Sequence, residues 1–311
     1  MLQNLLIGLL RNHKPPFGPP GKNAELTREY NEKRKSLSIS GYQEKYSLRL
    51  EKKELKLVES KGSHILKPVP AERLVLVKDM PANEHITTQI ARQIFGIKTA
   101  AAAMIFFDDG TPAYLTRRFD YKADGSKYQV EDFVTLLGKS PEAEGDDYKY
   151  NASYLDIAKL IQQYLPAAKV ELVNFFKLVV FNYLIANGDS HLKNFSVMES
   201  DQRDYLLSPG YDLMCTSLHL DEADICMRDG LFNGDYEEPA FMKTGMYTRP
   251  AFISFAGKMD IFLKLGENII DELTGKEDAV RDLLSRSFLS DEGKIAYLKF
   301  FTARQIRLKS I

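Results

Sequence analysis

A polar run from residue 187 to 194, Asn-Gly-Asp-Ser-His-Leu-Lys-Asn, carries side chains suited to phosphoryl transfer. This chemistry needs a carboxylate that orients the attacking hydroxyl and oxygen ligands for Mg²⁺. Asp189 and Asn194 have the spacing found in kinase catalytic loops, and Asp212, after an expected strand, is a candidate second magnesium ligand. Asp and Asn also favour turns, so either Asp alone is equally well explained as a turn residue. Their combination after a buried helix predicts a catalytic loop.

His191 lies inside this run, and we expect it to support Asp189, either by a hydrogen bond or by holding the loop in place. A zinc site built from histidine and cysteine is the alternative for His191. It would need His191, Cys215, His219 and Cys226, whose spacing matches no zinc motif.

Lys67 and Glu84 form a second pair of interest. Lys67 stands in a short strand-like stretch, where a lysine is more often an edge-strand charge. A kinase, however, requires a strand lysine on the ATP phosphates and an acid from the following helix to position it. Glu84 begins the next expected helix, so we expect a Lys67–Glu84 ion pair.

Two further stretches are candidates for contact with ATP. Residues 36–45 contain Ser38, Ser40 and Gly41, whose hydroxyl and backbone N–H groups suit phosphate oxygens, although a simple turn explains them equally well. Residues 116–120 include Arg117 and Phe119 and end the last strand of the first lobe, where a crossing segment presents backbone groups to a purine. A strand end with a solvated arginine pair is the alternative.

The elements that must position these residues change in character along the chain. Alternating apolar residues predict strands at 46–57, 63–68, 73–78, 102–107 and 113–119, with a helix capped by Asn83 and ended by Gly96. Later segments, at 153–165, 169–186 and 257–311, are helical, and 205–207 is a short strand. We therefore predict an α+β, bilobed, protein-kinase-like fold, with an N-terminal segment (1–35), a β-rich N-lobe (36–124) and a helical C-lobe (125–311).

Composition narrows the class of protein. The net charge of −1 does not favour nucleic acid as a direct partner. The longest apolar run, within 172–186, is interrupted by polar residues, and no membrane span is expected. The two cysteines form no C-x-x-C motif, which fits a reducing cytoplasm.

The set of motifs resembles the HipA family of bacterial toxin kinases. The matching pieces lie between residues 36 and 216, in family order: 38–45 (SISGYQEK), 64–68 (HILKP), 83–85, 118–120, 131–132, 187–195 and 207–212. The resemblance implies a serine/threonine kinase with Asp189 as base, Asn194 and Asp212 as Mg²⁺ ligands, Lys67 on the phosphates and residues 117–119 against adenine. It also implies autophosphorylation at Ser38 or Ser40, which switches the enzyme off.

The resemblance also suggests partners. Family targets are aminoacyl-tRNA synthetases, and neutralising antitoxins are small HipB-like or HipS-like proteins. The short stretch before the serine loop is most similar to the HipT type, which lacks an N-terminal subdomain. Where relatives carry Gln before the acidic pair 131–132, this chain has Val130, which leaves no expected nucleotide contact there.

Two other functions are compatible with the same residues. An aminoglycoside- or choline-type phosphotransferase uses a similar loop, but a serine loop offers the protein its own hydroxyl substrate and favours a protein kinase. A catalytically dead, kinase-like binding module would need no magnesium ligands, yet all of them are present in this sequence.

Overall fold

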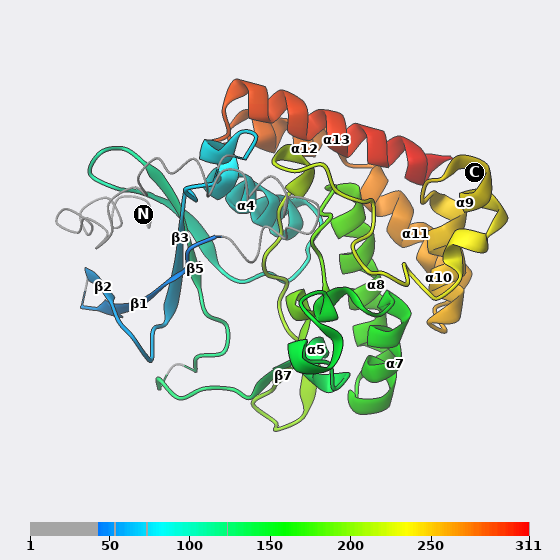
Figure 1. The fold of residues 1–311 in the computed structure, drawn as a ribbon, viewed down its shortest axis with the longest axis horizontal. Helices are drawn as coiled ribbons and strands as arrows, with labels where there is room; N and C mark the ends of the chain where they lie inside the picture. The colour runs from blue at the N-terminus through cyan, green and yellow to red at the C-terminus, as the bar shows by residue number, and fades with distance from the viewer. Residues whose placement is uncertain (1–42, 53, 73, 123, 311) are drawn as a thin grey trace.

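The computed structural model describes residues 43–52, 54–72, 74–122 and 124–310. Ser38, Ser40, Gly41 and the N-terminal segment 1–35 lie outside the described residues. A β-rich part and a helical part lie side by side, with helix α8 at the centre of the helical part (Figure 1). The predicted α+β, kinase-like fold class is confirmed, whereas the domain boundaries stay a prediction.

The N-lobe is built on an antiparallel sheet in the order β2-β1-β3-β5-β4. Its strands are β1 (Tyr46–Glu51), β2 (Glu54–Leu57), β3 (His64–Pro68), β4 (Ala102–Phe106) and β5 (Pro112–Arg117). Neighbouring side chains of a strand point to opposite faces. Leu66 of β3 therefore joins the small apolar core of the sheet, while the adjacent Lys67 points to the other face.

Helix α4 (Met80–Gln89), continued by the π-helical turn η3 (Ile90–Ile94), covers that other face and packs on β4 and β5. Two predictions are wrong here. The strand expected at 73–78 is absent over the described residues 74–78: Leu76 has a left-handed backbone (φ 46°), the carbonyl of Val75 accepts a hydrogen bond from His219, and η2 (Val77–Asp79) is a 3₁₀ turn. Asn83 is not an N-cap, because the helix begins one turn earlier at Met80 and buries Asn83 inside it.

The C-lobe surrounds the buried helix α8 (Ala168–Leu184), whose Phe175, Phe176, Val180 and Phe181 have no exposed surface. Helix α7 (Tyr154–Tyr164) packs against α8 and begins with a capping box between Ser153 and Asp156. The remaining helices are α5 (Phe133–Leu136), α6 (Pro141–Glu144), α9 (Pro239–Thr244), α10 (Arg249–Lys258), α11 (Leu263–Thr274), α12 (Glu277–Ser285) and α13 (Asp291–Lys309), with 3₁₀ turns η4 (Tyr148–Tyr150), η5 (Leu192–Asn194), η6 (Thr216–Leu218) and η7 (Asp235–Glu237).

A second, three-stranded sheet lies beside the catalytic loop, in the order β6 (Val130–Asp132), β7 (Ser196–Glu199) and β8 (Tyr205–Leu207). After β8 the chain returns to the N-lobe side, where Thr99 and Gly210 form a short parallel bridge. In the part of the chain that the structure describes, no helix has both the length and the apolar surface to cross a bilayer.

Candidate active site

The catalytic loop follows directly after helix α8 and is held by its own amide side chains. Asn187 donates from Nδ2 to Asn182 Oδ1 (2.8 Å), and Asn187 Oδ1 accepts from the backbone N–H of Asp189 (3.2 Å). Asn194 then donates from Nδ2 to the carbonyl oxygen of Asp189 (3.2 Å). These bonds close the loop, so that Asp189 and Asn194 line the same pocket, as the spacing of the two residues predicts.

The Asp189 carboxylate contacts two aromatic side chains. Tyr150 donates from its hydroxyl to Asp189 Oδ1 (2.8 Å), and His191 Nε2 lies 3.9 Å from the same oxygen. Burial lowers the pKa of His191 to about 3, so its imidazole is neutral at physiological pH. Neither ring nitrogen of His191 has a hydrogen-bond partner among the described residues. The contact agrees with a supporting place for His191 beside Asp189.

Lys67 is the centre of a buried charge cluster. Its Nζ donates to Glu84 Oε1 (2.5 Å), as predicted from the sequence, and also to Asp212 Oδ1 (2.5 Å). Burial alone would lower the pKa of Lys67, but the Asp212 and Glu84 carboxylates outweigh it and the net pKa is raised. Lys67 therefore stays an ammonium group, although only 4% of its surface is exposed.

The two acids of this cluster differ in their electrostatics. Burial disfavours ionised Asp212, yet the charges of Lys67 and of Lys45, 3.9 Å away, outweigh burial and hold the pKa of Asp212 well below its usual range. For Glu84, burial is the larger effect, and it raises the pKa despite the Lys67 charge. Of the two acids that bind Lys67, Asp212 is thus the firmly ionised one, as a cation ligand should be.

Asp212 is held by the backbone around it. Its φ of 52° is a left-handed conformation that a non-glycine residue rarely adopts. Gly210 exchanges backbone hydrogen bonds with Lys98 and Ala100, and the Tyr211 hydroxyl donates to the Lys193 carbonyl (2.7 Å). The left-handed conformation of Asp212 is therefore held by the two residues that precede it.

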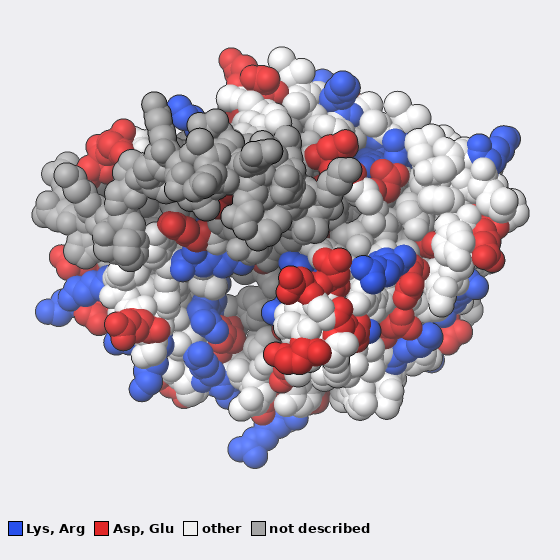
Figure 2. All heavy atoms as spheres, in the orientation of Figure 1, with Lys and Arg blue, Asp and Glu red and all other residues white. Residues whose placement is uncertain are grey.

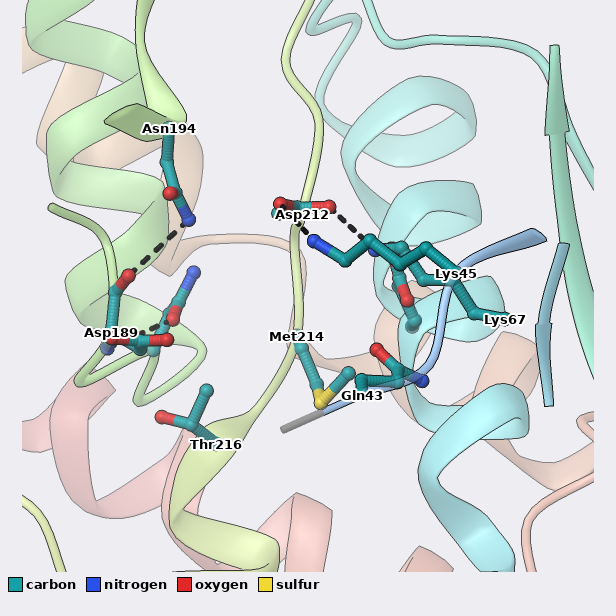
Figure 3. Close-up of a pocket in the computed structure, with 10 residues that line it drawn as sticks. Gln43, Lys45, Lys67, Asp189, Asn194, Asp212, Met214 and Thr216 are labelled. Carbon is teal, nitrogen blue, oxygen red and sulfur yellow. Dashed lines mark hydrogen bonds and ion pairs between the residues drawn. The ribbon is translucent and has the colours of Figure 1, made fainter. Parts of the chain in front are cut away.

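These residues converge on one pocket with an empty volume of about 310 Å³, partly open to solvent. Lys45, Lys67 and Gln43 reach it from the N-lobe side, and Asp189 and Asn194 face them (Figure 3). The full lining is Gln43, Lys45, Lys67, Glu84, Asn187, Asp189, Asn194, Asp212, Met214 and Thr216. On the surface, a hollow lies between the lobes, mostly with basic side chains along its left rim and acidic ones along its right (Figure 2).

The pocket offers groups suited to a magnesium–nucleotide ligand. The carboxylate of Asp212 and the amide oxygen of Asn194 are hard oxygen donors, which Mg²⁺ prefers. Two buried polar atoms of the lining, Gln43 Nε2 and Glu84 Oε2, have no hydrogen-bond partner among the described residues. Within those residues, no group of three or more His, Cys, Asp or Glu side chains could hold a metal, which gives the zinc alternative no support.

Arg117 and Phe119 do not line this pocket. The Arg117 side chain is exposed at the end of β5, and the Phe119 ring packs on Tyr211 with 5.6 Å between centroids. Their contact with adenine stays a prediction, as do the roles of Ser38, Ser40 and Gly41, which lie outside the described residues.

Several supporting residues had no recognisable signal in the sequence. Thr216 accepts from the Gly188 N–H (2.7 Å) and donates to the Ala186 carbonyl (3.3 Å), which braces the start of the loop. Burial and the nearby Asp189 carboxylate raise the pKa of Glu222 to about 7, against an opposing effect of Thr216. Lys45, which lines the pocket, could have been predicted from the sequence, because it ends the 36–45 stretch that we expect to contact ATP.

Comparison with known proteins agrees with this geometry. The family described as HipA-like C-terminal domain matches residues 37–279. A putative kinase of Haemophilus influenzae is 25% identical over 308 residues, which cover 93% of this chain and 87% of that protein. The putative kinase Y4dM of Sinorhizobium fredii is 30% identical over 175 residues, covering 52% of this chain and 40% of the relative.

Two solved structures share the fold. One is the complex of Shewanella oneidensis HipA with HipB and operator DNA, with a TM-score of 0.67, 19% identity and coverage of 95% of this chain and 73% of that one. The other is the Helicobacter pylori proinflammatory kinase CtkA, with a TM-score of 0.51, 14% identity and coverage of 82% and 90%. At these identities the two structures establish the fold.

Proposed function

We propose that the chain, which belongs to the HipA-like C-terminal domain family and has relatives named as putative kinases, is a Mg²⁺- and ATP-dependent serine/threonine protein kinase. The observation that carries the proposal is the Lys67 ammonium held between Glu84 and Asp212, in the same pocket as Asp189 and Asn194. Phosphoryl transfer depends mainly on positioning and charge, and these five side chains supply both.

Each residue has a defined part in this proposal. Asp189 accepts the proton of the attacking hydroxyl, with neutral His191 packed beside it. Lys67, positioned by Glu84, neutralises phosphate oxygens of ATP. Asn194 and Asp212 hold Mg²⁺, which offsets charge on the phosphates when bound. The ionised state of Asp212 and the protonated state of Lys67 are set before any ligand arrives.

We extend the proposal to the biological role. The structural neighbour from Shewanella oneidensis is described as the HipA of a toxin–antitoxin system in complex with HipB and operator DNA. By this likeness we propose that the chain is a HipA- or HipT-like toxin, bound by a small HipB-like or HipS-like antitoxin, without contacting nucleic acid itself. The proposed substrate is an aminoacyl-tRNA synthetase, and the proposed place of action is the cytoplasm.

The test is incubation of purified protein with Mg·ATP, followed by intact mass and phosphopeptide analysis. We expect a phosphate on Ser38 or Ser40 in the wild type, and none in Asp189→Asn or Asp212→Asn. The starting mass shows whether the protein arrives already phosphorylated. A dephosphorylated wild type that modifies neither itself nor a panel of synthetases, but phosphorylates an aminoglycoside or choline, would refute protein kinase activity.

A further inference from the structure

Tyr150 reaches the catalytic carboxylate from outside the catalytic loop. It belongs to the turn η4, and its hydroxyl donates to Asp189 Oδ1 at 2.8 Å. Its ring also packs edge-on against the ring of His191, with 5.4 Å between centroids and 72° between planes. One side chain thus contacts both loop residues that surround the expected transfer step.

The turn that carries Tyr150 is held on two sides. Toward the catalytic loop, Lys193 donates from Nζ to the Tyr148 hydroxyl (3.0 Å). On the other side, the Tyr150 carbonyl accepts from the backbone N–H of Arg228 (2.8 Å), and the Ala152 carbonyl accepts from that of Asp229 (3.1 Å). The position of the Tyr150 hydroxyl is therefore fixed by backbone bonds to residues 228–229, which lie beyond every motif of the family resemblance.

A hydrogen bond to one carboxylate oxygen has a direct geometric effect. It restricts rotation of the Asp189 carboxylate about its Cβ–Cγ bond and so fixes the direction of Oδ2 as well. A base that must meet an acceptor hydroxyl at hydrogen-bond distance works best when its orientation is set in advance. Asp189 is 4% exposed, so bulk water does not readily replace the phenol as donor.

We propose that Tyr150 is a positioning residue for phosphoryl transfer, which orients the Asp189 carboxylate. Tyr150 is itself held by the backbone hydrogen bonds from residues 228–229. The proposal rests on the kinase activity proposed above. It gives residues 228–229 a defined task, namely to fix the base through Tyr150 without touching the nucleotide. Tyr150 does not line the pocket that holds Lys67 and Asp212.

The test compares Tyr150→Phe with a matched control, Tyr128→Phe. Tyr128 also donates to a carboxylate, Asp201 Oδ1 at 2.6 Å, but Asp201 is exposed and has no proposed part in the chemistry. Both variants and the wild type are dephosphorylated, and the autophosphorylation rate is measured against Mg·ATP concentration. The melting temperature and the Mg·ATP dissociation constant are measured on the same samples.

We expect the limiting rate of Tyr150→Phe to fall about tenfold to hundredfold, the range for loss of one hydrogen bond to a charged group. Its Mg·ATP affinity should stay within about twofold of the wild type, and the control should match the wild type throughout. A limiting rate within threefold of the wild type overturns the proposal. So does a rate loss matched by an equal loss of Mg·ATP affinity, which would show a general structural role. An inactive wild type would instead refute the kinase function, and this proposal with it.

Discussion

Replacing Lys67 by methionine tests the buried charge cluster most directly. The substitution keeps the length and apolar stem of the side chain but removes the ammonium group that Glu84 and Asp212 share at 2.5 Å each. Glu84 is 1% exposed, so its carboxylate loses its ion-pair partner and gains little contact with water in exchange. Removing one partner of a buried ion pair costs about 3–5 kcal/mol of unfolding free energy at neutral pH, a large share of the total for a folded protein.

The loss should depend on pH in a defined direction. Burial already raises the pKa of Glu84, and Lys67 is the largest influence that lowers it. Without Lys67, the folded-state pKa of Glu84 rises further above its unfolded value. A carboxyl group of this kind favours folding below its unfolded pKa and loses that contribution as pH rises through its folded pKa. Lys67→Met should therefore be closer to the wild type at pH 5 than at pH 8.

The assay is urea unfolding followed by circular dichroism, because the chain contains no tryptophan. Lys177→Met is the control, since Lys177 pairs with Glu272 in a partly exposed position and its loss should cost about 1 kcal/mol. The double variant Lys67→Met, Glu84→Gln should recover part of the stability at pH 8. If Lys67→Met equals the control variant, or if its deficit is the same at both pH values, the charge-cluster argument is wrong.

Three further predictions concern the same site. Asp212→Asn should weaken the Mg²⁺ dependence of ATP binding at least tenfold, as titration calorimetry at varied Mg²⁺ would show, and an unchanged dependence would exclude Asp212 as a ligand. Gly188→Ala should slow autophosphorylation about a hundredfold, because an added Cβ lies 2.7 Å from Glu222 Cβ and 2.9 Å from the Ala223 carbonyl and must displace the loop; a wild-type rate would show that the loop is adaptable. The wild type should lose on the order of 3 kcal/mol of unfolding free energy between pH 4.5 and 7, because the folded pKa of Glu222, about 7, exceeds its unfolded value. Glu222→Gln should remove this loss, which urea unfolding at pH 5 and pH 8 measures. An equal loss of unfolding free energy in the wild type and the variant would contradict the prediction.

Much of the site could be predicted from the sequence, because its interacting residues lie close along the chain or belong to motifs that follow the order of the family resemblance. The Asp189–Asn194 loop closes through local amide bonds, and Lys67–Glu84 joins a strand to the next helix. The second partner of Lys67 was not predicted, since Asp212 is 145 residues away along the chain. Tyr150 was missed for the same reason: nothing in its own stretch indicates that its hydroxyl meets Asp189.

The incorrect predictions in the N-lobe have a shared cause. Residues 73–78 alternate like a strand, but Leu74 and Val77 pack on Met80 and Met214 instead of on a sheet. Asn83 is a residue type that commonly caps helices, yet its side-chain amide lies inside the helix and forms hydrogen bonds with the Cys215 backbone and with His219. In both cases contacts with residues more than 130 positions away override a correct local preference.

Three consecutive residues, 210 to 212, each connect to a different part of the protein. Gly210 pairs with the backbone at Thr99, Tyr211 bonds to the loop at Lys193, and Asp212 bonds to Lys67 in strand β3. A single residue inserted in this segment would displace these contacts from their partners, whereas the exposed turn at 108–110 can tolerate an insertion. The segment therefore connects the two lobes at three successive residues, and we expect its length to be as constrained as its amino-acid sequence.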